Sequence, residues 1–322
     1  MRTWCARPAS SPNDAGRASA GPYRNLSMTT PPMNQSGPRY PRDWHWPHGE
    51  HIAVSVTLAF ESFVNHSQIT LEKTANKTDH FSLSYAEYGA KAGIWRLMDL
   101  LDEFGIKSNV STNGLAAEKH PHVIRALVDA GHEVAGHAWA NDVLMRDDDP
   151  AAELEEIRRC TRVLTETAGR PPLGWTSPGS AGSANTLDFL KREGYLWNAD
   201  DASDDLPFIR ETAHGPIVIM PRTNLPHNDL WMWVWGRNPP SIIWDGFKDT
   251  FDELYREGQA GRPKWTEITL HAHMAGRPTL IPTLRRCLSY AREHQGVWWA
   301  TKSEIAAWTQ RMSGGDAGAP RA

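Results

Sequence analysis

Strand-like and helix-like segments alternate along most of this chain, and this alternation limits the possible folds more than any other feature. Apolar and β-branched runs predict strands at 51–60, 107–114, 132–139, 171–179, 194–200, 216–222 and 265–273. Helical spacing of apolar residues predicts helices at 92–105, 120–131, 150–168, 183–193, 245–258, 278–294 and 302–311. No internal linker or repeat interrupts the series. The sequence therefore predicts one parallel α/β domain over residues 45–312, closed into a barrel.

The two ends of the chain lack this pattern. Residues 1–44 are rich in Pro, Ser, Gly, Ala and Asn, and residues 313–322 in Gly and Ala, so we expect both to be flexible tails. The first tail has no apolar core of the kind found in secretory signals, which favours a cytoplasmic location. Met28 and Met33 are alternative translation starts beside Met1.

The composition argues against several classes of protein. The 322 residues include 34 basic and 38 acidic side chains and carry a formal net charge of −4, so no basic excess favours nucleic-acid binding. No apolar run approaches the roughly 20 residues that span a bilayer. Cys5, Cys160 and Cys287 are widely spaced and form no CxxC pair, which favours a reducing compartment. We expect the main partner to be a small-molecule substrate.

Residues able to do chemistry follow the predicted strands. These are Glu61 after the first strand, His137 after the third, Trp175 and Ser177 after the fourth, Asp200, Asp201, Asp204 and Asp205 after the fifth, Asn228 and Asp229 after the sixth, and His271 and His273 at the last. The carboxyl ends of parallel barrel strands converge on one face, where active sites form. This clustering indicates an enzyme with its active site on that face.

Five segments, in this order, resemble the motifs of the polysaccharide deacetylase superfamily, also called the NodB homology domain or carbohydrate esterase family 4. They are LAFES (58–62), GHEVAGHAWAND (131–142), RPPLGWTSPG (170–179), NADDASDDLPF (198–208) and ITLHAH (268–273). YPRDW (40–44), EYGAKAGIWRLMDLL (87–101), DDLPF (204–208) and LHAHMAGRP (270–278) are similar to the branch of metal-independent allantoinases and cyclic-imide hydrolases. The resemblance covers about residues 40–310. It implies a distorted, seven-stranded, TIM-like (β/α) barrel that hydrolyses an amide-type C–N bond.

The metal-binding positions depart from this resemblance. Metal-dependent deacetylases carry an Asp-Asp pair after the first strand and two histidines four residues apart, whereas this chain has Glu61-Ser62, and His137 with Asn141. Serine and amide oxygens are weak zinc ligands, so we expect no cofactor. The alternative left open is a divalent metal such as zinc, held by Glu61, His137 and His271.

Three residues are candidates for catalysis. We expect Glu61 to act as a general base for water or to orient it, with a pKa raised by a partly dry pocket; the competing interpretation is a solvated loop acid. The resemblance places His137 in the site and leaves His132 structural, although a core histidine bonded to a carbonyl is the alternative for His137. The resemblance implies that His271 protonates the leaving nitrogen or polarises the carbonyl, which suits a group titrating near neutral pH.

A second set of side chains is expected to bind the substrate: Trp139, Asn141, Trp175, Ser177, Asp204, Asp205, Asn228 and His273. His273 lies two residues beyond His271 and shares its face if the strand continues. Asp204 and Asp205 precede Leu-Pro, so a polar turn competes with substrate binding at these positions.

The family's arginine near the proline of the third motif is also missing. Its position is occupied by Thr176. No arginine therefore contacts the base unless Arg170 or Arg222 reaches it from elsewhere in the chain.

Tryptophan is unusually abundant, with 15 residues. Trp231, Trp233 and Trp235 alternate within WMWVWG, and a strand there would place all three on one face. Large apolar faces normally mark interaction surfaces, so we expect a homo-oligomer, either a dimer or a tetramer. The alternative is an aromatic lid over a ring-shaped substrate.

The sequence favours a hydrolase of a non-peptide C–N bond in a small, cyclic or acylated molecule such as a ureide or a cyclic imide. In this hypothesis Glu61 helps water to attack the carbonyl, and His137 and His271 stabilise the oxyanion and supply a proton to nitrogen. Two alternatives stay open. One is a metal-dependent N-deacetylase of an acetylated amino sugar or polysaccharide, and the other is a non-catalytic barrel that acts as a binding or assembly module.

Overall fold

The computed structural model describes residues 44–70, 77–143, 148–223 and 228–314. The predictions for residues 1–43, for 315–322 and for the starts at Met1, Met28 and Met33 lie outside the described residues. Trp44, which the sequence placed in the tail, packs edge-on against Trp46 with ring centroids 5.4 Å apart.

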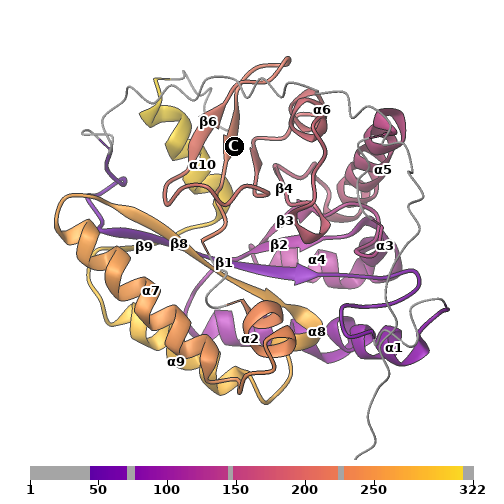
Figure 1. The fold of residues 1–322 in the computed structure, drawn as a ribbon, viewed down its shortest axis with the longest axis horizontal. Helices are drawn as coiled ribbons and strands as arrows, with labels where there is room; N and C mark the ends of the chain where they lie inside the picture. Colours follow the sequence, from indigo (N-terminus) through magenta and orange to yellow (C-terminus); the bar gives the residue numbers. More distant parts are fainter. Residues whose placement is uncertain (1–43, 71–76, 144–147, 224–227, 315–322) are drawn as a thin grey trace, which may run out of the picture. The chain divides into compact units, whose positions relative to one another are not determined.

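The described residues contain nine strands in one sheet, in the order β6-β7-β5-β4-β3-β2-β1-β8, with β9 paired to β1. The strands are β1 (Ile52–Phe60), β2 (Asn109–Thr112), β3 (Glu133–Gly136), β4 (Gly174–Trp175), β5 (Trp197–Asn198), β6 (Phe208–Arg210), β7 (Ile217–Ile219), β8 (Lys264–His271) and β9 (Val297–Trp299). Every pairing is parallel except that of β6 with β7. The sheet is mixed and strongly curled into a half-barrel, which confirms the distorted barrel that the sequence predicts (Figure 1).

Helices connect most of these strands. They are α1 (His80–Tyr88), α2 (Ile94–Glu103), α3 (Gly114–Lys119), α4 (Pro121–Asp129), α5 (Pro150–Ala168), α6 (Thr186–Arg192), α7 (Ile242–Gln259), α8 (Ala272–Ala275), α9 (Ile281–Arg292) and α10 (Lys302–Met312), with π-helices η2 (Gly89–Gly93) and η5 (Asp229–Trp235) and a 3₁₀ turn η3 (Pro178–Ser180). In the described part of the chain, no helix is both long and apolar enough to cross a membrane.

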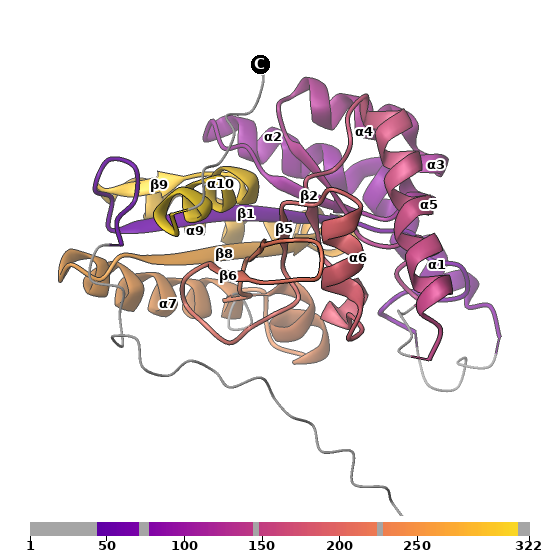
Figure 2. The same cartoon turned by 90° about the horizontal axis from the view of Figure 1, so that it is seen from above.

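Strand β1 pairs with three strands, β2, β8 and β9, and positions the site. All nine of its residues are buried, as expected for an apolar strand covered on both faces. Its register with β8 pairs Ala59 with His271. Since parallel strands end on the same side, Glu61 and His271 emerge at the same end of the barrel. Figure 2 shows β1 and β8 running side by side.

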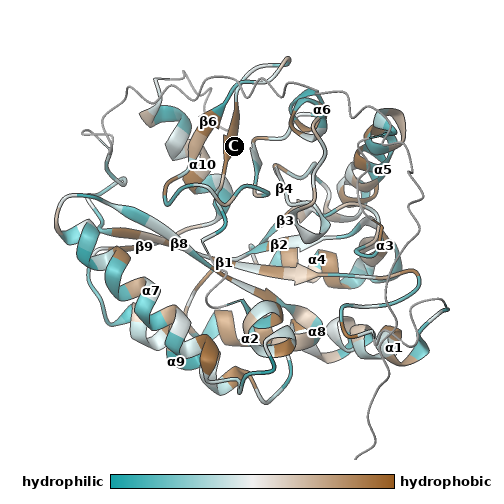
Figure 3. Ribbon diagram, in the orientation of Figure 1, coloured by the Kyte–Doolittle hydropathy of each residue, from teal (hydrophilic) through white to brown (hydrophobic). Residues whose placement is uncertain are grey.

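The covering helices follow the amphipathic pattern of the sequence. In α7 the buried residues Ile243, Phe247, Phe251 and Leu254 recur every three or four positions and face the sheet. Figure 3 shows hydrophilic and hydrophobic residues alternating along α7 and α9. Helix α5 begins at Pro150, as expected, with Asp149 accepting a hydrogen bond from the amide of Ala152.

One segment differs from the prediction. WMWVWG does not form a strand, because residues Asp229–Trp235 form the π-helix η5. The side-chain oxygen of Asn228 accepts hydrogen bonds from the amides of Leu230 and Trp231 and starts this helix. The three tryptophans therefore do not share a face. Trp233 packs against the core, whereas Trp231 and Trp235 remain about half exposed.

Candidate active site

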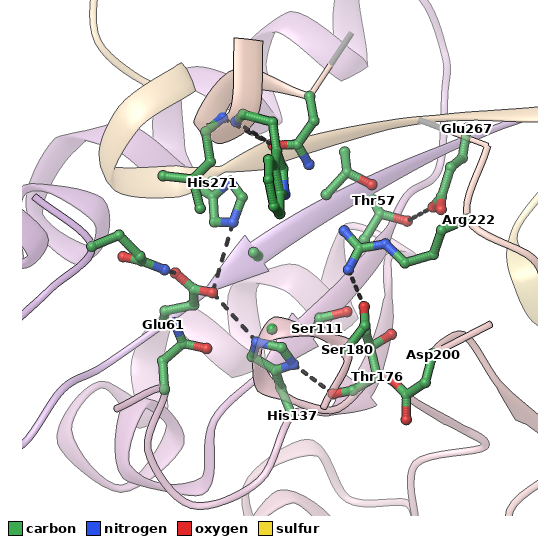
Figure 4. Close-up of a pocket in the computed structure, with 18 of the residues that line it drawn as sticks. Thr57, Glu61, Ser111, His137, Thr176, Ser180, Asp200, Arg222, Glu267 and His271 are labelled. Atoms are coloured by element: carbon green, nitrogen blue, oxygen red, sulfur yellow. Dashed lines mark hydrogen bonds and ion pairs between the residues drawn. The ribbon is translucent and has the colours of Figure 1, made fainter. Parts of the chain in front are cut away.

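A cavity of about 360 Å³ opens among the carboxyl ends of the strands. Glu61 follows β1, His137 follows β3, and His271 is the last residue of β8; all three line this cavity. Figure 4 shows them together on one wall. The volume lies within the range of small-molecule sites.

Glu61 is at the centre of this wall. Its Oε1 atom lies 3.3 Å from Nε2 of His137 and 3.9 Å from Nε2 of His271. Its other oxygen accepts a hydrogen bond of 2.8 Å from the side-chain amide of Gln68. The carboxylate is therefore held between two imidazole rings with one oxygen directed to both.

Asp229 holds His271 from behind. One carboxylate oxygen of Asp229 accepts the Nδ1 proton of His271 at 2.6 Å, and the other accepts the backbone amide of His271 at 2.7 Å. Asp229 is fully buried. These two bonds fix the ring so that Nε2 faces Glu61 and the cavity.

His137 is fixed by backbone contacts. Its Nδ1 lies within hydrogen-bond distance of the carbonyl oxygen of Thr176, and since a carbonyl can only accept, Nδ1 carries the proton and Nε2 faces the cavity. The next residue, Ala138, has a φ of 55°, which non-glycine residues rarely adopt. Asn113 donates to the carbonyl of His137, and the amide of Gly114 donates to that of Ala138. This strained turn sets the direction of the imidazole.

The charge states of the wall differ from the expectation for Glu61. Burial alone would raise the pKa of Glu61, but the charge of His271 and the close contact with His137 outweigh it and lower the pKa to about 2. Burial disfavours charge on His271, yet the charges of Asp229 and Glu61 raise its pKa to about 9. At neutral pH the wall thus holds a carboxylate beside an imidazolium, and the predicted rise in the pKa of Glu61 is wrong.

His273 does not share the face of His271. The strand ends at His271 and α8 begins with the next residue, so the side chain of His273 turns behind Glu61. Its Nε2 bonds to Oε1 of Gln68 at 3.1 Å, and its Nδ1 lies 3.9 Å from Oε2 of Glu61. Burial lowers the pKa of His273 to about 4, which keeps it neutral. It buttresses Glu61 from outside the main cavity.

The opposite wall carries a second group of charged side chains (Figure 4). Arg222 donates a hydrogen bond to Oγ of Ser180. Lys302 and Glu267 form a buried ion pair of 2.8 Å. Both oxygens of Asp200 accept bonds of 2.7 or 2.8 Å from Ser177 and Asn198. Arg222 therefore reaches the cavity that contains Glu61.

Among the residues expected to bind substrate, Asn141 and Asn228 line the cavity. Trp139 is buried beneath the guanidinium of Arg159, 3.3 Å from its ring centroid. Ser177 lies behind the wall, where it holds Asp200. The structure brings neither Trp139 nor Ser177 to the cavity surface.

Trp175 also lies in the core. It is fully buried, contacts Tyr195 edge-on, and donates to Oγ of Ser177. A Cβ atom on Gly136 would lie 2.5 Å from its ring, so this glycine is needed for the indole to fit. Trp175 therefore shapes the wall from behind without contacting the cavity.

Asp204 and Asp205 lie outside the cavity. Asp204 accepts hydrogen bonds from the amides of Asp205 and Leu206, as in the polar turn that the sequence left open. Asp205 lies 3.4 Å from Nζ of Lys264. Asp200, four residues before Asp204, lines the cavity instead. Arg170 lines a different cavity together with Gly131, Glu133 and Trp299.

Trp231 and Trp235 form the rim of the cavity. Their rings meet edge-on with centroids 5.0 Å apart. Trp235 also donates its indole N–H to the backbone carbonyl of Gln68 at 3.2 Å. The two rings present an apolar surface at the mouth, and this arrangement agrees with the lid interpretation of these tryptophans.

Sequence reasoning missed two parts of the site. Gln68 sits in a loop with no pattern that marks it, although it contacts Glu61, His273 and Trp235. The buried pair Glu267 and Lys302 comes from strand β8 and the start of α10, more than 30 residues apart. The signal available in the sequence was a glutamate and a lysine, each next to apolar residues. Charged pairs are rare in protein cores, so such a pair can indicate a functional site.

The donor set does not fit a metal ion. In the described stretches of the chain, no three His, Cys, Asp or Glu side chains are arranged to hold one. Oε1 of Glu61 already contacts both imidazole Nε2 atoms, and the amide of Asn141 stands where a second histidine would be needed. Ser62 is turned away, and its backbone groups bond to Asn113 and Asn141. We therefore derive no reaction step through a metal.

Known proteins resemble this chain over most of its length. The family model described as polysaccharide deacetylase matches residues 73–196. The crystal structure of PuuE allantoinase is 33% identical, covers 86% of this chain and 95% of its own, and superposes with a TM-score of 0.76. A probable polysaccharide deacetylase from Pseudomonas aeruginosa PAO1 gives the same identity, coverage and TM-score. A Schizosaccharomyces pombe protein named for the same activity is 27% identical over 303 residues, covering 83% of this chain and 92% of its own. The chain therefore belongs to the polysaccharide deacetylase family.

Proposed function

We propose that this protein hydrolyses a C–N bond of an amide, imide or ureide in a small, cyclic molecule. The observation that carries the proposal is the pair formed by Glu61 and His271 in a small cavity, with His271 held by the buried Asp229. The likeness to PuuE allantoinase, whose name states a ureide-hydrolysing activity, supports it.

Water attacks the substrate carbonyl beside Glu61. The carboxylate accepts one hydrogen of the water and takes that proton as the new C–O bond forms. His137 directs Nε2 at the same position, 3.3 Å from Oε1 of Glu61, and so helps to hold the water beside the carboxylate. The imidazolium of His271 donates to the oxygen that becomes negative.

His271 then supplies the proton that the leaving nitrogen needs. The C–N bond breaks, the nitrogen leaves as an amine or amide, and the carbonyl carbon becomes a carboxyl group. The charge of His271 keeps the pKa of Glu61 low, so Glu61 becomes a stronger base once His271 has lost its proton. The proton held by Glu61 returns to His271 across 3.9 Å and restores the starting state.

The test is an assay of purified, chelator-treated protein on allantoin, succinimide and N-acetylglucosamine oligomers. We expect ring opening of the ureide or imide, and loss of that activity in Glu61→Gln and His271→Gln. Glu253→Gln and His214→Gln, which change exposed residues outside the site, serve as matched controls and should retain activity.

Two results would overturn the proposal. Turnover of the sugar oligomers alone, restored by about one equivalent of zinc, would establish a metal-dependent deacetylase. No turnover of any of these compounds or of an acidic ring compound such as hydantoin-5-acetic acid, with or without added zinc, would indicate a non-catalytic barrel.

We also propose a cytoplasmic homo-oligomer whose partner is the small-molecule substrate. The absence of a basic charge excess supports a function without nucleic acid. Analytical ultracentrifugation tests the oligomeric state, and a monomer at micromolar concentration would refute it.

A further inference from the structure

We propose that Arg222 and Ser180 form a carboxylate-binding subsite opposite Glu61, so that the substrate carries an acidic group in addition to its C–N bond. This inference rests on the proposed hydrolase function and narrows its substrate class. It concerns the wall of the cavity that the reaction itself does not use.

Arg222 presents a positive charge to the cavity without a carboxylate partner. Its side chain donates to Oγ of Ser180, and within the described segments of the chain it forms no ion pair. Its backbone amide is anchored to the carbonyl of Asp201 at 2.7 Å. A guanidinium has five N–H donors, so donors remain for a ligand when one is bonded to Ser180.

The acidic side chains on the same wall are already engaged. Glu267 accepts from Nζ of Lys302 at 2.8 Å and from the hydroxyl of Thr57 at 3.1 Å. Asp200 has both oxygens bonded to Ser177 and Asn198. These contacts hold the two carboxylates in place. The charge of Arg222 is felt by Glu267, but the two side chains form no ion pair, so the guanidinium can bind an acidic group of a ligand.

Three buried polar side chains point to the same conclusion. The hydroxyls of Ser111 and Thr176 and the side-chain nitrogen of Asn228 have no hydrogen-bond partner in the described part of the chain, and all three residues line the cavity. Each residue is at least 90% buried. The side-chain oxygen of Asn228 caps η5, so the side-chain nitrogen is the atom that remains for a ligand. All three can donate, and buried polar groups are normally satisfied, so a ligand that brings acceptor oxygens would satisfy them.

A carboxylate fits these donors best. Its two oxygens match the planar fork of a guanidinium, and charge-assisted bonds of this kind are shorter and stronger than those to a neutral carbonyl. Ser180 is held in a left-handed conformation, with φ of 56°, and its amide bonds to the carbonyl of Ser177. Its hydroxyl therefore has a fixed position beside Arg222.

The two walls then divide the substrate between them. The scissile carbonyl lies against Glu61, His137 and His271, and the acidic group lies against Arg222 on the facing wall (Figure 4). Trp231 and Trp235 cover the apolar body of the molecule at the mouth. A neutral acetylated sugar offers no group that matches Arg222.

Matched substrates test the subsite. Hydantoin-5-acetic acid and hydantoin-5-acetamide have the same ring and differ only in the charge of the side chain. We expect the wild-type protein to prefer the acid by about 100-fold in kcat/KM. Arg222→Gln should raise KM for the acid by a similar factor, a loss far larger than any change for the amide. Arg222→Lys should recover part of the preference, and Arg256→Gln, on the exposed face of α7, should behave as wild type.

The outcomes separate this inference from the proposed function. Equal kcat/KM for acid and amide, or an equal loss for both in Arg222→Gln, would overturn the subsite and leave the hydrolase intact. If neither compound is turned over, calorimetry with glutarate decides the subsite, and the assay on allantoin and succinimide decides the proposed function. Binding weakened at least tenfold by Arg222→Gln would support it, and binding that is absent or unaffected would overturn it.

Discussion

Replacing Asp229 with asparagine is the most direct test of how the site is charged. The amide is nearly the same size as the carboxylate but carries no charge and only one acceptor oxygen. Asp229 receives the imidazole Nδ1 proton and the backbone amide of His271 on its two oxygens, so the variant loses one of these bonds as well as the charge. The substitution thus perturbs His271 without touching the substrate.

The expected magnitude follows from the pKa of His271. The difference between its ordinary value of 6.5 and the value of about 9 corresponds to roughly 3 kcal/mol in favour of the imidazolium. Burial opposes this charge, and Asp229 is the largest favourable influence. Without it, burial dominates and the pKa falls below its ordinary range. At pH 7.5 the variant would then lack its general acid, and since such a group typically contributes about 10²–10⁴-fold, we expect kcat/KM to fall by that factor.

The assay is a profile of kcat/KM against pH from 5 to 10. Wild type should keep its activity up to about pH 9 and then lose it, whereas Asp229→Asn should lose activity at a much lower pH and recover part of it near pH 5. Asp245→Asn, an exposed position in the first turn of α7, is the matched control. A folded Asp229→Asn protein with wild-type activity at pH 7.5, or with the same alkaline limb, would refute this account of His271.

Three further predictions concern the stability and geometry of the site. The pKa of His271 is higher in the folded state than its ordinary value, so its ion pairs stabilise the fold fully below pH 6.5 and lose this effect as the pH rises through 9. The melting temperature of the wild type should therefore fall between pH 6.5 and 9 by more than that of His271→Gln. Parallel curves of melting temperature against pH for the two proteins would contradict this. Lys302→Met leaves Glu267 buried without its cation and should lower the free energy of unfolding in urea by about 3–5 kcal/mol, with recovery in the double variant that also carries Glu267→Gln. Gln68→Ala removes the bond to Oε2 of Glu61 and should lower kcat about 10- to 100-fold with KM unchanged, and an effect on KM alone would assign Gln68 to substrate binding instead.

The sequence predicts the framework well because local patterns decide it. The apolar run at 51–60 and the capped, proline-initiated helix at 150–168 appear within a residue of their expected bounds as β1 and α5. Glu61, His137 and His271 come together because the carboxyl ends of parallel strands must meet. These features depend on residues adjacent in the chain or on a general rule of parallel sheets.

The parts that the sequence did not predict depend on contacts between distant segments. The alternating tryptophans of WMWVWG are typical of a strand, but the capping bonds of Asn228 and the contact of Trp235 with Gln68 stabilise a helix. A buried carboxylate normally has a raised pKa, and the three neighbouring histidines, His271 first among them, reverse that for Glu61. Which aspartate of 200–205 reaches the cavity is decided by Ser177 and Asn198, which hold Asp200.

The π-helix η5 sets the spacing between the two reacting side chains, Glu61 and His271. Its first residue, Asp229, holds His271, and its last, Trp235, holds Gln68, which in turn holds Glu61. The hydrogen bonds of a π-helix span five residues, one more than those of an α-helix. The extra residue therefore sets the distance between the two ends of η5. Deleting a single residue within Asp229–Trp235 would let the segment relax to an α-helix and shift one anchor against the other. The number of residues in η5 therefore sets the distance between the acid His271 and the base Glu61. Insertion or deletion of a residue in η5 should alter catalysis more than most substitutions in the cavity.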